Sequence, residues 1–157
     1  MASELVVTWE LSHEANLYLL AAIPRGGLAA SYAPRTRTVA AQFAHLHNVR
    51  LRWLQHAAPR TKTAVPAFPR GAQPAKAELK RALADSAEAI GAFLEASEAA
   101  GKVARWNGPP ASFLGYLVAH EAHHRGLALV ALRSAGHKVP PEVVYGLWDW
   151  GKRRSSR

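Results

Sequence analysis

The chain has 157 residues, no cysteine and a formal net charge of +9, from 20 lysine and arginine residues against 11 aspartate and glutamate residues. A chain of this length is typically one domain that buries about two-thirds of its surface without covalent cross-links. The absence of cysteine excludes disulfides and thiolate ligands, so any metal must be held by histidine, carboxylate or water. No apolar run reaches the length of a membrane span and no signal-peptide pattern opens the chain, so we expect a soluble cytoplasmic protein.

The positive charge would suit an anionic partner such as nucleic acid. The basic residues, however, are distributed over a terminal tail at 152–157, a proline-rich stretch at 58–74 and a predicted helix surface at 75–100. They lack the interleaved aromatic residues and the helix-turn-helix pattern of many nucleic-acid-binding proteins. We therefore expect a solvated basic surface and no specific binding of nucleic acid.

Two helices are predicted in the first part of the chain. Residues 4–23 are apolar nearly all round, and this helix should end before Pro24. Its inward stripe includes His13 and Asn16, which should either bond to each other or line a cavity. A second helix should run over 38–57, with Thr38 as its N-cap.

Two further long helices follow a connection at 58–74 that contains four prolines and that we expect to rim a site. Leucines and other apolar residues recur at helical spacing over 75–100, and again over 112–133. A short last helix should begin at Pro140 and Pro141. With no strand-like alternation, these elements predict an all-α, antiparallel four-helix bundle over residues 1–151 with a short fifth helix, and a basic polar tail at 152–157.

The helix at 112–133 carries two histidines within its apolar stripe. His120 and His124 are four residues apart, which places both imidazoles on one face, while His123 projects off that face. Neutral imidazole is a common ligand of Zn, Ni, Cu and Fe, and burying two unpaired imidazoles is costly. We therefore favour a metal site over a pair of hydrogen-bonded core histidines.

The same residues spell H-E-x-x-H, in which a metalloprotease uses Glu121 as general base between two Zn ligands. The extended form of that motif needs Gly and His where this chain has Leu127 and Val130. A credible third ligand is lacking, Glu142 being the only downstream candidate, and strands to hold a peptide are lacking as well. A zincin-like hydrolase that uses His120, Glu121 and His124 is therefore an alternative, not the main hypothesis.

The helix at 38–57 offers two more histidines, His45 and His47. Projected at 100° per residue, His47 lies nearer the centre of the apolar face, so periodicity weakly favours it. A helix wedged between two neighbours buries more than one narrow stripe, however, so periodicity leaves both histidines open.

The chain resembles the DinB/YfiT-like superfamily of metal-binding four-helix bundles over nearly its whole length. The residues that carry this resemblance are FAHLHNVRLRWL at 43–54, AHEAHHRG at 119–126 and AGHKVPPEVVYGLWDWG at 135–151. The resemblance implies a metal site made of His45, His120 and His124, because the family's first ligand stands directly before an apolar residue, here Leu46. His47 is the alternative first ligand.

Further expectations follow from the resemblance. The metal should be Zn or Ni, with Mn or Fe as further candidates, and the reaction should be the transfer of a small thiol onto an electrophile in detoxification or stress response. Glu121 and His123 would orient ligands or accept a proton, with Asn16, Trp53 and Trp148 as pocket walls. An excess of tryptophan and the dimers common among similar proteins predict a homodimer. The alternative is a non-catalytic stress protein that binds nucleic acid.

Overall fold

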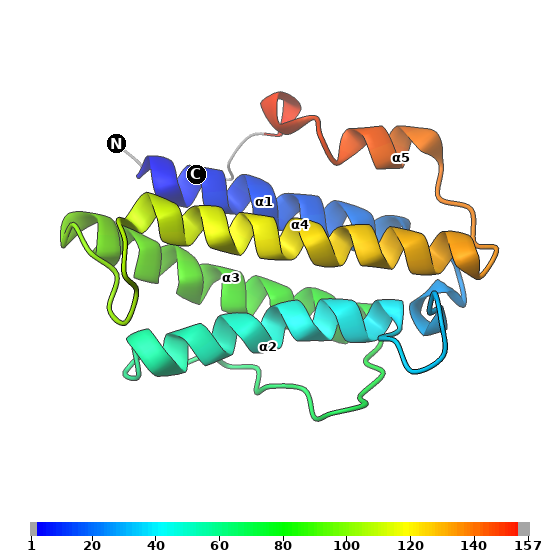
Figure 1. Cartoon of the computed structure of the whole chain (residues 1–157), viewed down its shortest axis with the longest axis horizontal. Helices are drawn as coiled ribbons and strands as arrows, with labels where there is room; N and C mark the ends of the chain where they lie inside the picture. The colour runs from blue at the N-terminus through cyan, green and yellow to red at the C-terminus, as the bar shows by residue number, and fades with distance from the viewer. Residues whose placement is uncertain (1–2, 154–157) are drawn as a thin grey trace.

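The computed structural model describes residues 3–153, and every regular element within that range is helical. Figure 1 shows four long helices side by side, with a short fifth helix on the outside of α1 and α4. The predicted four-helix bundle with a short fifth helix is thereby confirmed. The elements in chain order are α1 Glu4–Ala22, η1 Gly27–Ala29, α2 Val39–Ala57, α3 Lys76–Ala99, α4 Pro110–Ser134, α5 Pro141–Gly146 and η2 Trp150–Lys152.

The helices begin where the sequence supplies partners for their free amide groups. The Thr38 hydroxyl accepts a hydrogen bond from the Ala41 amide at 3.1 Å, which confirms Thr38 as the N-cap of α2. Ser3 caps α1 in the same way through the Val6 amide at 3.2 Å. At the other end of the chain, α4 stops before Gly136, which adopts a left-handed φ of 78° that a side chain would disfavour.

The four long helices form a bundle in which α1 and α2 lie diagonally opposite, each packed against both α3 and α4. The connection at 58–75 runs back along the bundle, so that α2 and α3 point in the same direction (Figure 1). The pair of α1 and α4 is also parallel, whereas α2 and α4 run in opposite directions. Because of this long connection, successive helices of the predicted antiparallel bundle do not simply alternate in direction: α2 and α3 run the same way.

The core consists of two apolar clusters, one near each end of the bundle. Large side chains such as Leu46, Leu83 and Leu132 fill one end, and Trp9, Ile90 and Phe113 fill the other. Each fully buried side chain of this size contributes roughly 1.5–3 kcal/mol to folding. Between the clusters, each long helix places polar residues inside the bundle. This middle layer holds Asn16 of α1, Arg50 of α2, Ser86 of α3, and Glu121 and Arg125 of α4, which are buried and bonded to one another.

The C-terminal segment folds back onto α1. The Tyr18 hydroxyl donates a hydrogen bond to the Glu142 carbonyl at 3.4 Å, and the Arg153 guanidinium lies 4.8 Å above the Tyr18 ring. The predicted polar tail begins at Lys152, and its residues 154–157 lie outside the described part of the chain. Within residues 3–153, none of the helices combines the length and the apolar character needed to cross a membrane.

Candidate metal centre

Three histidines from two facing helices meet on one side of the bundle. His45 of α2 and the pair His120 and His124 of α4 each offer one ring nitrogen, and these three nitrogens lie within 4.8 Å of one another. The ring centroid of His45 is 5.3 Å from that of His120 and 4.5 Å from that of His124. These are the three residues that the resemblance implied, and together they could hold a metal ion.

The other two candidate histidines lie elsewhere. His47 is fully buried, and its Nε2 lies 3.2 Å from the Pro66 carbonyl of the connection at 58–75. Periodicity correctly placed His47 on the more buried side of α2, but His47 faces this connection and α3 and lies outside the group of three, because α2 buries two faces, one against each neighbour. The exposed His123 stacks edge-on against His124, with ring centroids 5.1 Å apart, and is outside the group of three.

Residues one turn away on each helix position the histidine rings. Gln42 precedes His45 by three residues, and its Oε1 accepts a hydrogen bond from His124 Nδ1 at 2.7 Å. When Nδ1 carries the proton, the free lone pair of the His124 ring is on Nε2, which can then coordinate a metal ion. Tyr116, one turn before His120, stacks on the His120 ring with centroids 6.0 Å apart. The tautomer of His124 and the plane of His120 are thus set by the bundle.

The electrostatics of the centre keep these imidazoles neutral. Burial, followed by the positive charge of Arg37, lowers the pKa of His45 to about 4. Burial and the two neighbouring histidines lower the pKa of His124 to about 3. The pKa of His120 is lowered as well, chiefly by burial. Because metal ligation requires neutral imidazole, the three side chains are ready to bind a cation at neutral pH.

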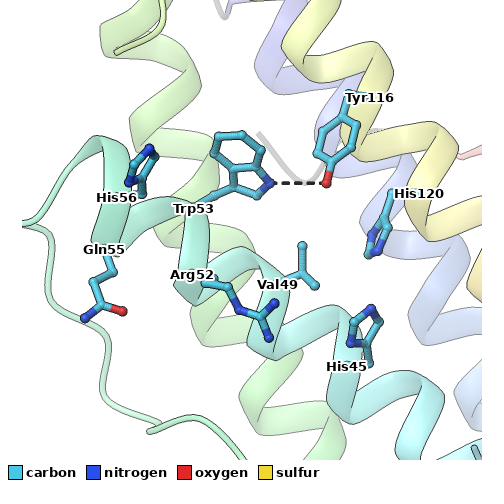
Figure 2. Close-up of a pocket in the computed structure, with 8 residues that line it drawn as sticks. All are labelled: His45, Val49, Arg52, Trp53, Gln55, His56, Tyr116 and His120. Carbon is cyan, nitrogen blue, oxygen red and sulfur yellow. Dashed lines mark hydrogen bonds between the residues drawn. The ribbon is translucent and has the colours of Figure 1, made fainter. Parts of the chain in front are cut away.

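Two cavities adjoin the three histidines. The first has a volume of about 620 Å³ and is lined by His45 and His120 together with aromatic side chains. Figure 2 shows Trp53 and Tyr116 closing one end of this cavity, with the indole Nε1 donating to the Tyr116 hydroxyl at 3.4 Å. The second cavity has a volume of about 880 Å³ and shares His45 and Arg52 with the first. The centre therefore lies where two cavities meet.

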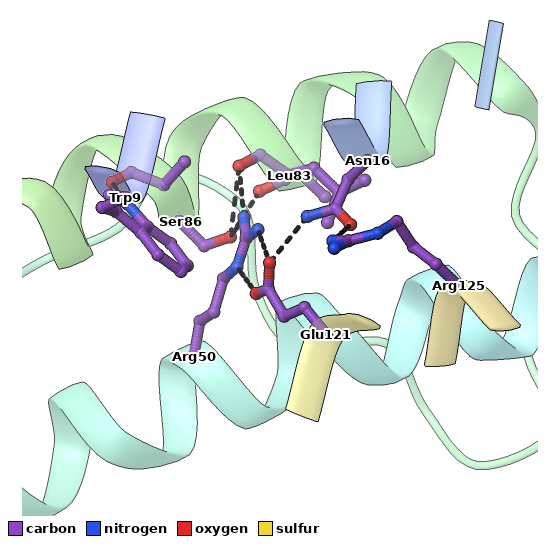
Figure 3. A network of polar contacts seen from close by, with 9 residues as sticks. Trp9, Asn16, Arg50, Leu83, Ser86, Glu121 and Arg125 are labelled. Atoms are coloured by element: carbon purple, nitrogen blue, oxygen red, sulfur yellow. Dashed lines mark hydrogen bonds and ion pairs between the residues drawn. The ribbon is translucent and has the colours of Figure 1, made fainter. Parts of the chain in front are cut away.

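Glu121 points away from this centre into the bundle. It is 1% exposed, and both of its carboxylate oxygens bind Arg50 of α2, at 2.7 and 3.1 Å (Figure 3). Arg50 opposes burial and holds the pKa of Glu121 below its usual range. Glu121 is more deeply buried than His120, so the buried face of α4 is centred on it and not on the histidine pair. A carboxylate in this position does not favour the predicted role as a general base or the zincin-like alternative.

The ion pair belongs to a network that involves all four long helices. Arg50 also donates to the Leu83 carbonyl at 2.8 Å and to Ser86 Oγ at 3.3 Å. Asn16 donates to Glu121 at 2.6 Å and accepts from Arg125 at 2.7 Å. The prediction for Asn16 was therefore wrong in both forms, because this side chain neither bonds to His13 nor lines one of the cavities at the histidines.

Of the two tryptophans predicted to form pocket walls, only Trp53 lies at the candidate centre. Trp53 lines the first cavity, as predicted. Trp148 is 81% exposed and lies beside α5 and the outer face of α4, away from the three histidines. His13 of α1, the other residue of the predicted polar pair with Asn16, also lies near the interior network. Burial, followed by the charge of Arg50, lowers the pKa of His13 to about 3.

Sequence reasoning missed three residues that shape the centre. Arg50 interrupts the apolar series Leu46, Arg50, Leu54, a pattern that predicts a buried cation with a partner. Gln42 shares a helix face with His45, which could have identified it as a ligand-orienting residue. No pattern in the sequence indicates that Arg37, in the segment before α2, lies near all three histidines.

The fold and the site together define a helical bundle of the kind that could hold a metal ion between two of its helices, here α2 and α4. The chain belongs to the DinB family, whose model matches residues 1–153, which confirms the resemblance seen in the sequence. A search of curated proteins finds no significant match.

Proposed function

We propose that this protein is a metal-dependent transferase that activates a small thiol and joins it to an electrophilic compound. The observation that carries the proposal is the group His45, His120 and His124, whose nitrogens converge within 4.8 Å at the junction of two cavities. Three protein ligands leave coordination positions for a substrate, whereas a structural site commonly has four. The chain belongs to the DinB family, the family whose resemblance led to the expectation of thiol transfer.

The donor set fits a divalent metal. All three proposed ligands are neutral nitrogen donors, a set that suits Zn, Ni or Fe. Mn prefers oxygen donors and is therefore a weaker match to this set. When bound, the metal lowers the pKa of a coordinated thiol, so that the sulfur is a thiolate at neutral pH. Gln42 would hold His124 in the tautomer that presents Nε2, and the Arg37 and Arg52 charges would favour the anionic sulfur.

The cavities supply places for both reactants. The aromatic end at Trp53 and Tyr116 suits the apolar part of an electrophile. In the reaction, the thiol releases its proton to solvent, the sulfur forms a bond to the electrophilic carbon, and the leaving group departs with the electron pair of its broken bond. Small thiols are kept reduced in the cytoplasm, where such a transferase would act in detoxification or stress response.

Elemental analysis of protein purified without a histidine tag or added metal is the first test. We expect about one equivalent of a divalent metal in the wild-type protein and far less in His124→Ala. The same preparations are then incubated with a panel of small thiols and 1-chloro-2,4-dinitrobenzene, whose thioether product absorbs light. Stoichiometric metal in variants at all three histidines would refute the centre, and metal without thioether formation from any thiol would remove the transferase assignment.

We also propose a homodimer that forms through the face at α5. Trp148 is 81% exposed and Tyr145 is 73% exposed, and an apolar cavity of about 320 Å³ lies beside Trp148. Trp9, by contrast, is buried in the core and does not contribute to an apolar surface. Sedimentation should give a dimer that Trp148→Glu converts to a monomer; a wild-type monomer would contradict the proposal.

A further inference from the structure

The second cavity gathers positive charge that the sequence distributes over three segments. Arg35 and Arg37 come from the segment before α2, Arg52 from α2 itself, and Arg70 from the connection at 58–75. No aspartate or glutamate is among the residues that line this cavity. The sequence-based expectation of basic residues spread over a solvated surface therefore does not describe this face. We call this cavity the arginine groove.

None of the four arginines forms a salt bridge with an aspartate or glutamate of the described residues. Within residues 3–153, the ion pairs are Arg50 with Glu121 and Lys152 with Asp149, and neither includes an arginine of the groove. Four like charges around one concavity repel each other, and the shape of the groove concentrates their field. An anion that enters the groove relieves this repulsion and can accept paired hydrogen bonds from a guanidinium group.

The walls of the groove are held in place before any ligand arrives. Asn48 fixes the segment next to Arg70, because its side chain both donates to the Phe68 carbonyl and accepts from the Phe68 amide, each at 2.9 Å. Arg35 adopts a left-handed φ of 64°, which is unfavourable for a residue with a side chain and is maintained by the surrounding loop. The hydroxyl of its neighbour Thr36 supports that loop by bonding to the amide and the carbonyl of Ala33, at 3.3 and 2.7 Å.

The groove is continuous with the candidate metal centre. His45 and Arg52 line both cavities, and Arg37 is close enough for its charge to affect all three histidines. A molecule bound by the arginines therefore lies beside His45, the histidine of the centre that lines the groove. The first cavity is lined by aromatic side chains and a single arginine, Arg52, so the two cavities that meet at His45 offer different chemistry.

We propose that the arginine groove binds the carboxylate or phosphate group of a small molecule whose other end reaches the three histidines. This inference rests on the proposed function and deepens it, since it assigns an anionic group to one reactant and the groove as its binding site. The aromatic cavity then receives the second, less charged reactant. The two reactants then reach the centre through different cavities.

The test measures the binding of two simple anions by titration calorimetry at low ionic strength, where charge interactions are least screened. Sodium phosphate and sodium succinate are titrated separately into the full-length protein as isolated. The variant Arg35→Gln/Arg70→Gln removes two charges from the groove without touching the histidines. The matched control Arg60→Gln/Arg81→Gln removes two charges from exposed positions outside it. The metal content of each sample is measured in parallel.

We expect at least one anion to bind the wild-type protein and the control variant equally. The groove variant should bind it about tenfold more weakly or worse, with unchanged metal content. Binding of phosphate alone, or of succinate alone, would support the groove and identify the chemical class of its ligand. Absence of binding by both anions, or an equal loss in the control variant, would overturn the inference.

Two further outcomes separate this inference from the proposed function. Protein that retains metal but binds neither anion would disprove the groove alone. Protein that binds an anion in the groove but retains no metal would disprove the metal-dependent transferase and leave an anion site. A single-stranded oligonucleotide that binds much more tightly than either small anion, and that the groove variant loses, would replace the small-molecule ligand with nucleic acid.

Discussion

Two polar clusters of α4 lie next to each other in the sequence and differ in almost every physical respect. His120 lines the first cavity and His124 lies beside His120 and His45, and most of the ring nitrogens of the pair have no protein partner within hydrogen-bonding distance in the described chain. Glu121 and Arg125 lie one residue further on, yet they are buried and bonded to Arg50 and Asn16. One cluster has free lone pairs at a cavity, and the other has used its hydrogen-bonding capacity inside the protein.

This contrast separates binding from stability. A buried ion pair with every strong acceptor occupied has little capacity for a substrate, but the removal of one partner leaves a charge without compensation. Histidines with free lone pairs at a cavity contribute little to folding and are available to a metal. Changes in the two clusters should therefore affect different measurements.

The largest expected effect is on folding and comes from Glu121→Gln. The substitution keeps the size of the side chain but leaves Arg50, which is 1% exposed, without a counter-ion. We expect a loss of about 3–5 kcal/mol in the free energy of unfolding. Urea denaturation of the metal-free protein would measure it. A general base at Glu121 predicts the opposite pattern, in which thiol transfer disappears while stability hardly changes.

Comparison of His45→Ala with His47→Ala sharpens the distinction between the two histidines of α2. His45→Ala should reduce metal affinity by roughly a hundredfold or more, since it removes a proposed ligand. His47→Ala should keep the metal and cost about 2 kcal/mol of stability, because this fully buried side chain bonds to the connection at 58–75. Elemental analysis and urea denaturation of both variants would decide. Metal loss in His47→Ala alone would reverse the assignment.

The third effect is the pH dependence of stability due to His13. Burial and Arg50 lower its folded-state pKa from 6.5 to about 3, while Glu121 opposes this shift. Between these values the unfolded chain binds more protons, so stability is complete above pH 6.5 and falls as the pH decreases towards 3. From about pH 7 to about pH 5, His13 should account for a loss of about 2 kcal/mol. Metal-free His13→Gln should show a correspondingly smaller loss than the metal-free wild-type protein.

The smallest effect tests how the bundle prepares the candidate centre. Gln42→Leu preserves the packing volume but removes the acceptor for His124 Nδ1, which lies at 2.7 Å. Metal affinity should fall about tenfold while the free energy of unfolding stays within roughly 1 kcal/mol of the wild-type value. Competition with a chromogenic chelator would measure the affinity. Gln55→Leu is the control, because Gln55 is exposed at the wall of the first cavity, further along α2 from His45, and does not contact a proposed ligand. Equal affinities in the two variants would show that Gln42 does not orient the ligand.

The sequence by itself determined the helices and part of the centre. Caps such as Thr38 and breaks such as Gly136 act through local backbone geometry, so helix limits could be predicted from neighbouring residues alone. The pair His120 and His124 could be predicted because helical periodicity places residues four apart on one face. His45 was identified by the resemblance to the family and not by periodicity.

Only the tertiary structure decided which side each polar residue of these helices faces. An interior helix contacts two neighbours, so its single apolar stripe does not reveal that His47 turns towards α3 and His45 towards α4, while Arg50 reaches both neighbours. The partnership of Arg50 and Glu121, and the gathering of Arg35 and Arg70 in one groove, depend on the course of the chain between the helices. Such contacts join residues far apart in the sequence, and their energies depend on burial and on distances that no local pattern contains.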